Sequence, residues 1–276
     1  MPEDYDEHLT TLHSAWTTPP DTVALLVGEV AATEIVDMRR VVHGEANEVY
    51  DVTLRRAPSL IVRIAHGGAD ALEREAWVLG ECAVRGIAAP RVHSLRHMEI
   101  DGKHLAAILM DKIEGDRLCD LELPEATLRQ VLGEVGEWLR ALHAIPVRGF
   151  GYLDRQGACT LPTIEAWLDV LTSESSAFER AGLAVGLAPE TIRSWLDEIV
   201  DACRASPLRV ALIHNDLLAR HVLVREGRLA GIIDFGEVAA EPVANEFAKW
   251  DFCEGDRFPV EWIQHCLLYT SPSPRD

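Results

Sequence analysis

The segment VALIHNDLLARHVLVREGRLAGIIDFG, residues 210–236 of this 276-residue chain, alternates short apolar runs with polar loops. The three apolar runs are Val210–Ile213, Val222–Val224 and Leu229–Ile233. Each run is short, rich in β-branched residues and bounded by turn-forming residues, which is typical of strands. A polar loop, His214–His221, follows the first run, and the charged turn Arg225–Arg228 joins the other two. The segment therefore predicts a strand, a polar loop and then a hairpin.

Polar side chains gather where these predicted strands end. His214, Asn215, Asp216 and His221 follow the first strand, and Asp234 follows the third. Two carboxylates and two imidazoles that converge at strand ends, where burial of polar groups is otherwise costly, indicate a reaction site. The alternative is that Asp216 caps a turn and Asp234 begins a hairpin, but the spacing of the two residues favours the reaction site.

Phosphoryl transfer is the chemistry that needs this set of groups. One carboxylate receives or orients the acceptor hydroxyl, and oxygen-rich ligands hold the Mg²⁺ that bridges the phosphates. Protein kinases place the first carboxylate in a loop and the second in an Asp-Phe-Gly motif. Asp216 matches the catalytic position, and Asp234, in Asp234-Phe235-Gly236, matches the metal position.

His214-Asn215-Asp216, His221 and the Asp234-Phe235-Gly236 motif together resemble the aminoglycoside phosphotransferase family, whose members are small-molecule kinases with a protein-kinase-like fold. The family usually has Asn where this chain has His221, and His recurs there in the 2″-aminoglycoside and macrolide branches. The resemblance implies that Asp216 and His214 belong to the catalytic set and that His221 and Asp234 hold Mg²⁺. Because Mg²⁺ prefers oxygen ligands, a hydrogen bond from His221 to a phosphate or to Asp216 is the alternative.

Composition narrows the choice of partners. The formal net charge of −19 argues against nucleic acid or an anionic membrane. It suits a cationic small-molecule antibiotic such as an aminoglycoside, although acidity that serves only solubility is an equally good account. The six cysteines are scattered without a Cys-x-x-Cys pair, which predicts reduced thiols in the cytoplasm. The sequence shows no signal peptide and no apolar run long enough to span a bilayer.

Residues 1–110 predict a β-rich nucleotide-binding lobe. The expected elements are a helix at Thr22–Ala32 with Asp21 as its cap, a helix at Ala69–Arg85, and strands at Ile35–Val42, Leu60–Ala65, Val92–Leu95 and Leu105–Met110. The resemblance places a nucleotide loop with Gly44 and Asn47 just before a strand that runs to Leu54. Gly44 has no Cβ and would let backbone amides approach the phosphates, although a lone Gly in a hairpin is more often only a turn.

Arg63 falls where the family has a cation facing the nucleotide phosphates. Standing between Val62 and Ile64, Arg63 faces the opposite side of the strand from both, which by itself is the pattern of a solvent-facing residue. The resemblance implies that Glu75 in the following helix pairs with Arg63 and fixes its direction. Glu73 is the alternative, because the sequence does not determine which face of the helix meets the strand.

Asp111–Gly115 resembles the hinge at which the family binds the base of the nucleotide through the backbone. Met110, Lys112 and Ile113 are therefore predicted to contact the nucleotide, with Met110 and Ile113 flanking the base. Backbone hydrogen bonds leave little trace in the side chains, so the sequence leaves both ATP and GTP open as co-substrates.

The part of the chain after the hinge predicts a mainly helical lobe. The expected helices are Glu125–Ile145, Ile164–Leu171, Pro189–Cys203 and Val243–Phe252. A polar loop, Thr172–Ser176, is expected to border the substrate site.

Acidic residues near the end of this lobe are candidates for two roles. Glu246 or Asn245 stands near the structural Asp of the family, with the register open by one residue. Asp251, Glu254 and Asp256 form an acidic cluster that could receive the ammonium groups of a substrate. The alternative for the cluster is a solvated helix end.

The complete pattern predicts an α+β, bilobal protein-kinase-like fold. It comprises a nucleotide-binding lobe at 1–110, a hinge at 111–115 and a catalytic and substrate lobe at 116–265. The last stretch, CLLYTSPSPRD at 266–276, resembles the translation of a sequencing-library adapter, so the natural C-terminus is expected to be truncated.

The expected reaction is the Mg²⁺-dependent transfer of the γ-phosphoryl group of ATP or GTP to a hydroxyl of an aminoglycoside, which would confer antibiotic resistance. The alternative acceptors are a macrolide or a small metabolite such as an amino alcohol or a sugar. An inactive truncated fragment that only binds nucleotide is a further alternative.

Overall fold

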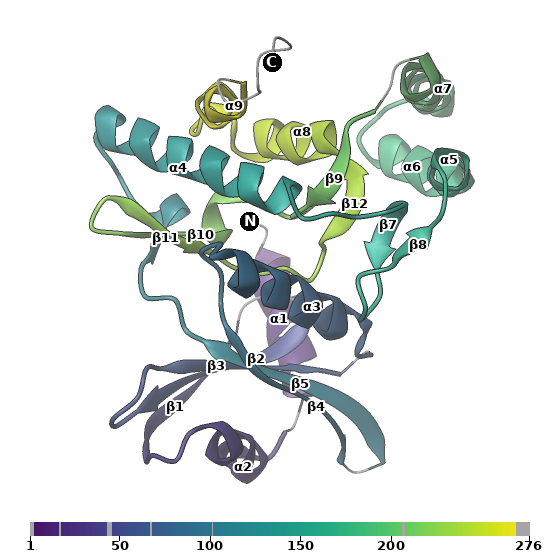
Figure 1. The fold of residues 1–276 in the computed structure, drawn as a ribbon. Helices are drawn as coiled ribbons and strands as arrows, with labels where there is room; N and C mark the ends of the chain where they lie inside the picture. The colour runs from purple at the N-terminus through teal and green to yellow at the C-terminus, as the bar shows by residue number, and fades with distance from the viewer. Residues whose placement is uncertain are drawn as a thin grey trace.

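The computed structural model describes residues 3–16, 18–42, 46–66, 68–100, 102–205 and 208–268, with backbone alone at 3–7 and 265–268. The N-terminal part is a five-stranded sheet flanked by helices, and the C-terminal part is mainly helical (Figure 1). The predicted α+β, bilobal architecture is confirmed. Gly44 and residues 269–276 lie outside the described residues.

The N-terminal sheet has the strand order β1-β2-β3-β5-β4, and every neighbouring pair is antiparallel. Its strands are β1 (Ile35–Val41), β2 (Asn47–Leu54), β3 (Leu60–Ala65), β4 (Val92–Ile100) and β5 (Lys103–Asp111), and its flanking helices are α2 (Pro20–Val30) and α3 (Asp70–Arg85). Because side chains alternate along a strand, the sheet has two faces. Val62 and Leu109 pack with α2 on one face, whereas Ile108 and Met110 join the core shared with α3 on the other. The second face is the one that looks toward the C-terminal part.

The helix α4 (Glu125–His143) forms the centre of the C-terminal part. Its residues Leu132, Val135 and Leu139 are fully buried, and α9 packs against it (Figure 1). The other helices are α5 (Ile164–Ser173), α6 (Ser175–Ala184), α7 (Pro189–Ala205), α8 (Val243–Glu254) and α9 (Val260–Leu268). The stripe of apolar residues predicted for α4 is therefore core.

The predicted strand, polar loop and hairpin are confirmed, but they belong to two different small sheets. The hairpin is β10 (Val222–Arg225) and β11 (Arg228–Ile232), joined by a turn in which Glu226 and Gly227 both have positive φ. It pairs with β6 (Asp116–Arg117). The preceding strand is β9 (Val210–Ile213), in a sheet with β12 (Ala239–Pro242), β7 (Phe150–Leu153) and β8 (Cys159–Leu161). The loop at 214–221 therefore connects the two sheets.

An N-terminal strap, made of α1 (Glu3–Ser14) with Trp16 and Thr18, is attached to the first sheet. The ring of Trp16 stacks on His66, with centroids 5.4 Å apart. Arg40 donates to the backbone carbonyl of His13 at 2.7 Å. These contacts hold the strap against the sheet, beside the end of β1 and the residue that follows β3.

A buried carboxylate, Glu48, is the centre of this attachment. Thr18 Oγ1 and Tyr50 Oη each donate to Glu48 at 2.7 Å, and His66 Nε2 lies 2.9 Å from it. Burial raises the pKa of Glu48, but these hydrogen bonds and the charge of Arg40 outweigh burial and hold its pKa below the ordinary value of 4.5. The folded chain therefore favours the ionised form.

Replacing Glu48 with Gln is expected to lower the free energy of unfolding by about 2 kcal/mol at neutral pH, because the donors on Oε2 would face an amide NH₂ group. The folded pKa lies below the unfolded one, so the contribution of Glu48 is present above the ordinary pKa and disappears as pH falls through the folded pKa. Urea unfolding of both proteins, from neutral pH to about pH 3, should show the difference shrinking with pH. A difference that stayed constant would contradict the charge-based account.

Several details differ from the prediction. Helix α2 begins at Pro20 with Pro19 as its N-cap, and Asp21 lies in the first turn without a capping hydrogen bond. Proline suits the first helical position, since it has no N–H to leave unpaired. The predicted polar loop Thr172–Ser176 is instead the junction of α5 and α6, which only Glu174 separates. Helices α1, α6 and α9 were not predicted from the sequence. In the part of the chain that the structure describes, no helix combines the length and apolarity needed to cross a membrane.

Candidate active site

The carboxylate of Glu246, in α8, holds the backbone of the loop at 214–221, hereafter the catalytic loop. The carboxylate of Glu246 accepts from His214 N at 2.5 Å and from Asn215 N at 3.2 Å, and it is buried. Asn215 has a φ of 63°, a left-handed conformation that Asn tolerates better than most residues. Of the two candidates for the structural acid, the structure therefore identifies Glu246. Asn245 instead donates to Glu241 at 2.9 Å.

His214 lies beneath the loop and is fully buried. Its Nε2 lies 3.1 Å from the carbonyl oxygen of Ile233, and its Nδ1 accepts from Asp216 N at 3.3 Å. Burial lowers the pKa of His214, which keeps the imidazole neutral. Because both ring nitrogens make a hydrogen bond, His214 links the catalytic loop to the residue after β11 and fixes the backbone of Asp216.

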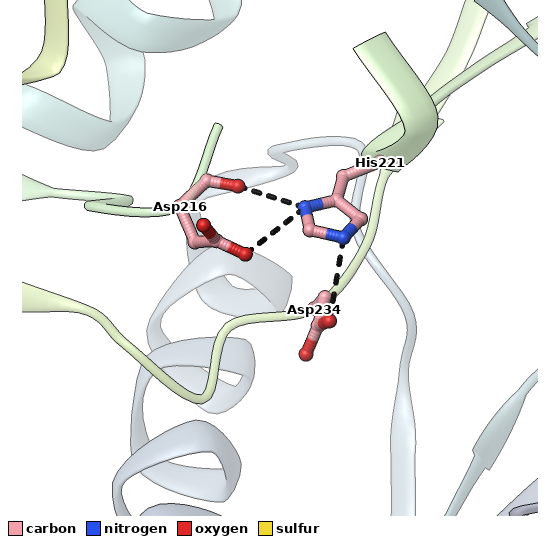
Figure 2. A group of neighbouring side chains, drawn as sticks. All are labelled: Asp216, His221 and Asp234. Atoms are coloured by element: carbon pink, nitrogen blue, oxygen red, sulfur yellow. Dashed lines mark hydrogen bonds and ion pairs between the residues drawn. The ribbon is translucent and has the colours of Figure 1, made fainter. Parts of the chain in front are cut away.

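Asp216, His221 and Asp234 converge at one point, as the sequence predicts (Figure 2). His221 Nδ1 lies 2.7 Å from the carbonyl oxygen of Asp216 and 3.5 Å from its Oδ2. His221 Nε2 lies 3.4 Å from Asp234 Oδ2 and accepts from Arg220 Nε at 3.1 Å. Because Nε2 accepts this bond, the ring proton is assigned to Nδ1, where it can be donated to the carbonyl oxygen of Asp216.

These three residues can hold a divalent cation. One ligand atom from each lies within 4.8 Å of the others in the described part of the chain. Two carboxylates supply the oxygen ligands that Mg²⁺ prefers, and phosphate oxygens and water complete its shell in kinases. The donor set therefore fits Mg²⁺, with the carboxylates as the stronger ligands and His221 as the weaker one.

Arg63 connects this point to the first sheet. Its Nη1 donates to both oxygens of Glu75, at 2.6 and 2.9 Å, and its Nη2 donates to Asp234 Oδ1 at 3.1 Å. Glu73, the alternative partner, instead pairs with His97 at 3.2 Å. Burial lowers the pKa of Arg63, but the charges of Glu75 and Asp234 outweigh it and keep the guanidinium protonated. The predicted Arg63–Glu75 pair is therefore present, and it also reaches Asp234.

Asp234 begins the Asp-Phe-Gly motif with a φ of 70°. Its surroundings desolvate the carboxyl, which raises its pKa, but Arg63, His221 and His214 outweigh this and hold the pKa below its usual range. Phe235 is fully buried and packs on the ring of His214, with centroids 4.9 Å apart. The motif is thus anchored in the core by Phe235, while the Asp234 side chain stays ionised and 41% exposed.

Arg74, one residue before Glu75, clamps the end of this motif and was not predicted from the sequence. Its Nε and Nη2 donate to the carbonyl oxygen of Gly236 at 3.1 and 2.6 Å. The guanidinium stacks on Tyr152, 4.3 Å from the ring centroid, and Tyr152 Oη donates to Glu237 at 2.7 Å. A single turn of α3 therefore holds both the carboxylate end and the glycine end of Asp234-Phe235-Gly236.

The residues predicted to contact the nucleotide differ in their surroundings, and each of those described has a protein partner or is buried. Asn47, with its amide oxygen turned toward Arg63, accepts from Nη2 at 2.8 Å. Met110 is buried at the end of β5. The Lys112 ammonium pairs with Asp51 at 3.0 Å. Ile113 packs against Gly231. A Cβ added at Gly231 would lie only 2.6 Å from Cδ1 of Ile113.

The acidic cluster does not gather around Asp216. Glu254 accepts from Ala219 N at 2.9 Å and so supports the catalytic loop. Asp251 and Asp256 are exposed. By helical periodicity, Asp251 points away from Lys249, the α8 residue that does reach Asp216.

Lys249, like Arg74, makes a contact that sequence reasoning missed. Its Nζ lies 2.7 Å from Asp216 Oδ1 and donates to the carbonyl oxygen of Asn215 at 2.9 Å. No local pattern marks this lysine, because only the packing of α8 against the catalytic loop brings it there. A residue 33 positions beyond Asp216 thus contacts the predicted catalytic carboxylate.

A model of the phosphotransferase enzyme family, APH, matches residues 37–263. The crystal structure of aminoglycoside phosphotransferase APH(4)-Ia is similar, with a TM-score of 0.68 and 20% identity over 91% of this chain and 82% of that one. A ternary complex of a thermostable APH(4)-Ia mutant with ADP and hygromycin B has a TM-score of 0.67 and 19% identity, over 89% and 80% of the two chains. The gentamicin complex of APH(2″)-IIa has a TM-score of 0.62 and 17% identity, over 92% and 82%. These similarities confirm the predicted protein-kinase-like fold.

Tyrosine-protein kinase Src64B of Drosophila melanogaster is 45% identical over 53 residues. The match spans 18% of this chain and 8% of that kinase. This chain therefore corresponds to only a small fraction of that relative's length.

Proposed function

Because the chain belongs to the phosphotransferase enzyme family, whose model matches residues 37–263, we propose that it transfers the γ-phosphoryl group of ATP or GTP to a hydroxyl of an aminoglycoside. The observation that carries the proposal is the convergence of Asp216 and Asp234, with Arg63 and Glu75 joined to the same point. Positioning and charge neutralisation supply most of the catalysis in phosphoryl transfer, and this cluster provides both.

In this proposal Asp216 binds the acceptor hydroxyl and takes its proton. The hydroxyl oxygen forms a bond to the γ-phosphorus, the bond from phosphorus to the β-phosphate oxygen breaks, and a nucleoside diphosphate leaves. Arg63, held in direction by Glu75, binds the phosphates from the side of the first sheet. Asp234 and His221 would hold Mg²⁺, which when bound neutralises charge on the phosphate oxygens.

Two observations support an aminoglycoside as the acceptor. The structural neighbours include complexes with hygromycin B and with gentamicin. The net charge of −19 would attract a polycation over distance. Within the proposal, residues 1–110 carry the nucleotide, 111–115 form the hinge, and 116–265 carry the acceptor.

A coupled assay of nucleoside diphosphate release tests this function. The protein is incubated with Mg²⁺ and either ATP or GTP, across a panel of aminoglycosides, macrolides, sugars and amino alcohols. We expect release that depends on an aminoglycoside and falls to background when a chelator removes Mg²⁺. Nucleotide binding without release for any aminoglycoside would contradict the proposal.

A further inference from the structure

Two neighbouring residues of α3 hold Asp234, one through its side chain and the other through the backbone that follows it. Glu75 fixes the direction of Arg63, whose Nη2 donates to Asp234 Oδ1 at 3.1 Å. Arg74 instead donates to the carbonyl oxygen of Gly236, through Nε at 3.1 Å and through Nη2 at 2.6 Å. The side chain of Asp234 and the end of its motif are therefore tied to the same helix by two different arginines.

The backbone at Asp234 needs such support because it is strained. Asp234 has a φ of 70°, in the left-handed region that residues with a Cβ adopt at an energetic cost. Such a conformation persists only where the surrounding contacts fix it. Before Asp234, the N–H of Ile233 donates to the carbonyl oxygen of His221 at 3.0 Å. After Asp234, the two hydrogen bonds from Arg74 bind the motif at Gly236, so the loss of Arg74 would leave this side of the strained residue less restrained.

Arg74 is itself fixed by a closed ring of contacts. Its side chain is buried, and its guanidinium stacks on Tyr152 of β7, 4.3 Å from the ring centroid. Tyr152 Oη donates to Glu237 at 2.7 Å, and Glu237 directly follows Gly236, the residue that Arg74 binds. The ring thus joins α3, the end of the motif and β7. Because each contact limits the others, the ring fixes the direction of Arg74 more firmly than one hydrogen bond would.

The cation site described above depends on the direction of the Asp234 carboxylate. Asp234 Oδ2 lies 3.4 Å from His221 Nε2, and one ligand atom from each of Asp216, His221 and Asp234 lies within 4.8 Å of the others. A change of the backbone at Asp234 would turn its carboxylate away from the other two ligands. Residues that orient the ligands of a metal without touching it commonly change metal affinity by about 10- to 100-fold when they are replaced.

We propose that Arg74 is a positioning residue that keeps the Asp234 carboxylate directed at the Mg²⁺ site, and that Tyr152 supports Arg74 in this role. The inference rests on the proposed function and deepens it, because it assigns residues that shape the metal site from outside. Arg74 acts on Asp234 through the backbone at Gly236. A residue that only stabilised the fold would change the free energy of unfolding, but it would not selectively change the part of nucleotide affinity that depends on Mg²⁺.

Calorimetric titration with AMP-PNP tests this inference when it is done twice, in excess Mg²⁺ and in EDTA. The ratio of the dissociation constant in EDTA to that in Mg²⁺, hereafter the metal gain, measures how well the protein's own ligands hold the Mg²⁺ that the nucleotide carries. In Arg74→Met we expect the metal gain to fall about tenfold, while the affinity in EDTA stays within about twofold of wild type. Arg74→Lys, which keeps a donor, and Tyr152→Phe, which keeps the ring, should each lower the metal gain about threefold.

The matched control is Arg85→Met, which removes the same charge from the last turn of α3, where Arg85 pairs with Glu81 at the surface. It should keep the metal gain within about twofold of wild type, because a surface ion pair contributes little. The inference is overturned if Arg74→Met keeps the wild-type metal gain, if it loses affinity equally in Mg²⁺ and in EDTA, or if Arg85→Met loses as much metal gain as Arg74→Met.

Two further outcomes are decisive. A wild-type protein that binds AMP-PNP no more tightly with Mg²⁺ than with EDTA would also overturn the inference. If Arg74→Met does not fold, Arg74→Lys and Tyr152→Phe decide, and an unchanged metal gain in both would contradict the positioning role. The metal gain is measured without an acceptor, whereas diphosphate release with aminoglycosides reports the proposed function, so either result can fail while the other stands.

Discussion

Replacing Asp216 with Asn is expected to lower kcat about a thousandfold and to leave nucleotide affinity nearly unchanged. Asn has the same shape as Asp and can still accept the hydrogen bond from Lys249, but it cannot take the proton of the acceptor hydroxyl. Arg63, proposed to bind the phosphates, and Asp234, proposed to hold Mg²⁺, pair with each other and stay in place without the Asp216 charge. Steady-state kinetics and a separate measurement of nucleotide dissociation would divide the two effects.

The matched control is Asp197→Asn on α7, an exposed carboxylate outside the catalytic loop. It removes the same charge and should keep kcat within about twofold of wild type. Near wild-type turnover in Asp216→Asn would rule out Asp216 as the catalytic base, whereas loss of nucleotide binding would place it in the phosphate site.

The second large effect is expected for Glu246→Ala, which should lower the free energy of unfolding by about 3 kcal/mol and abolish turnover. The buried carboxylate accepts two backbone N–H groups, those of His214 and Asn215. Its removal leaves both donors unpaired, and each buried unpaired group costs about 1–3 kcal/mol. It also releases the left-handed backbone at Asn215, which sets the direction of Asp216.

Urea unfolding and kinetics of the same preparations would measure this prediction. Glu254→Ala is the matched control, because Glu254 accepts a single backbone N–H group, that of Ala219, and is only partly buried. We expect it to cost about 1 kcal/mol and to leave a measurable rate. Equal losses of stability in the two variants would contradict the prediction that Glu246, through its two backbone hydrogen bonds, stabilises the loop more than Glu254 does.

Local sequence was enough to identify the parts of the site that depend on strand patterns and short spacings. The runs around the catalytic loop predicted β9 and the β10–β11 hairpin, because the alternation and length of strands are local properties. Asp216, His221 and Asp234 followed, since each lies at the end of a predicted element. Arg63 and Glu75 were identified by resemblance, although the strand pattern alone would have left Arg63 in solvent.

The remaining contacts of the site were decided by packing between distant parts of the chain. Three contacts depend on which face a helix turns toward a loop from another part of the chain. They are those of Glu246 with the catalytic loop, Arg74 with Gly236, and Lys249 with Asp216. The partners in these contacts are separated by 31 to 162 residues, a range over which sequence periodicity carries no information. The same limit explains the acidic cluster, because α8 presents Lys249, and not Asp251, to the carboxylate of Asp216. A sequence can place a residue on a helix, but the direction of its side chain relative to a distant carboxylate is decided only when the helices and sheets have packed.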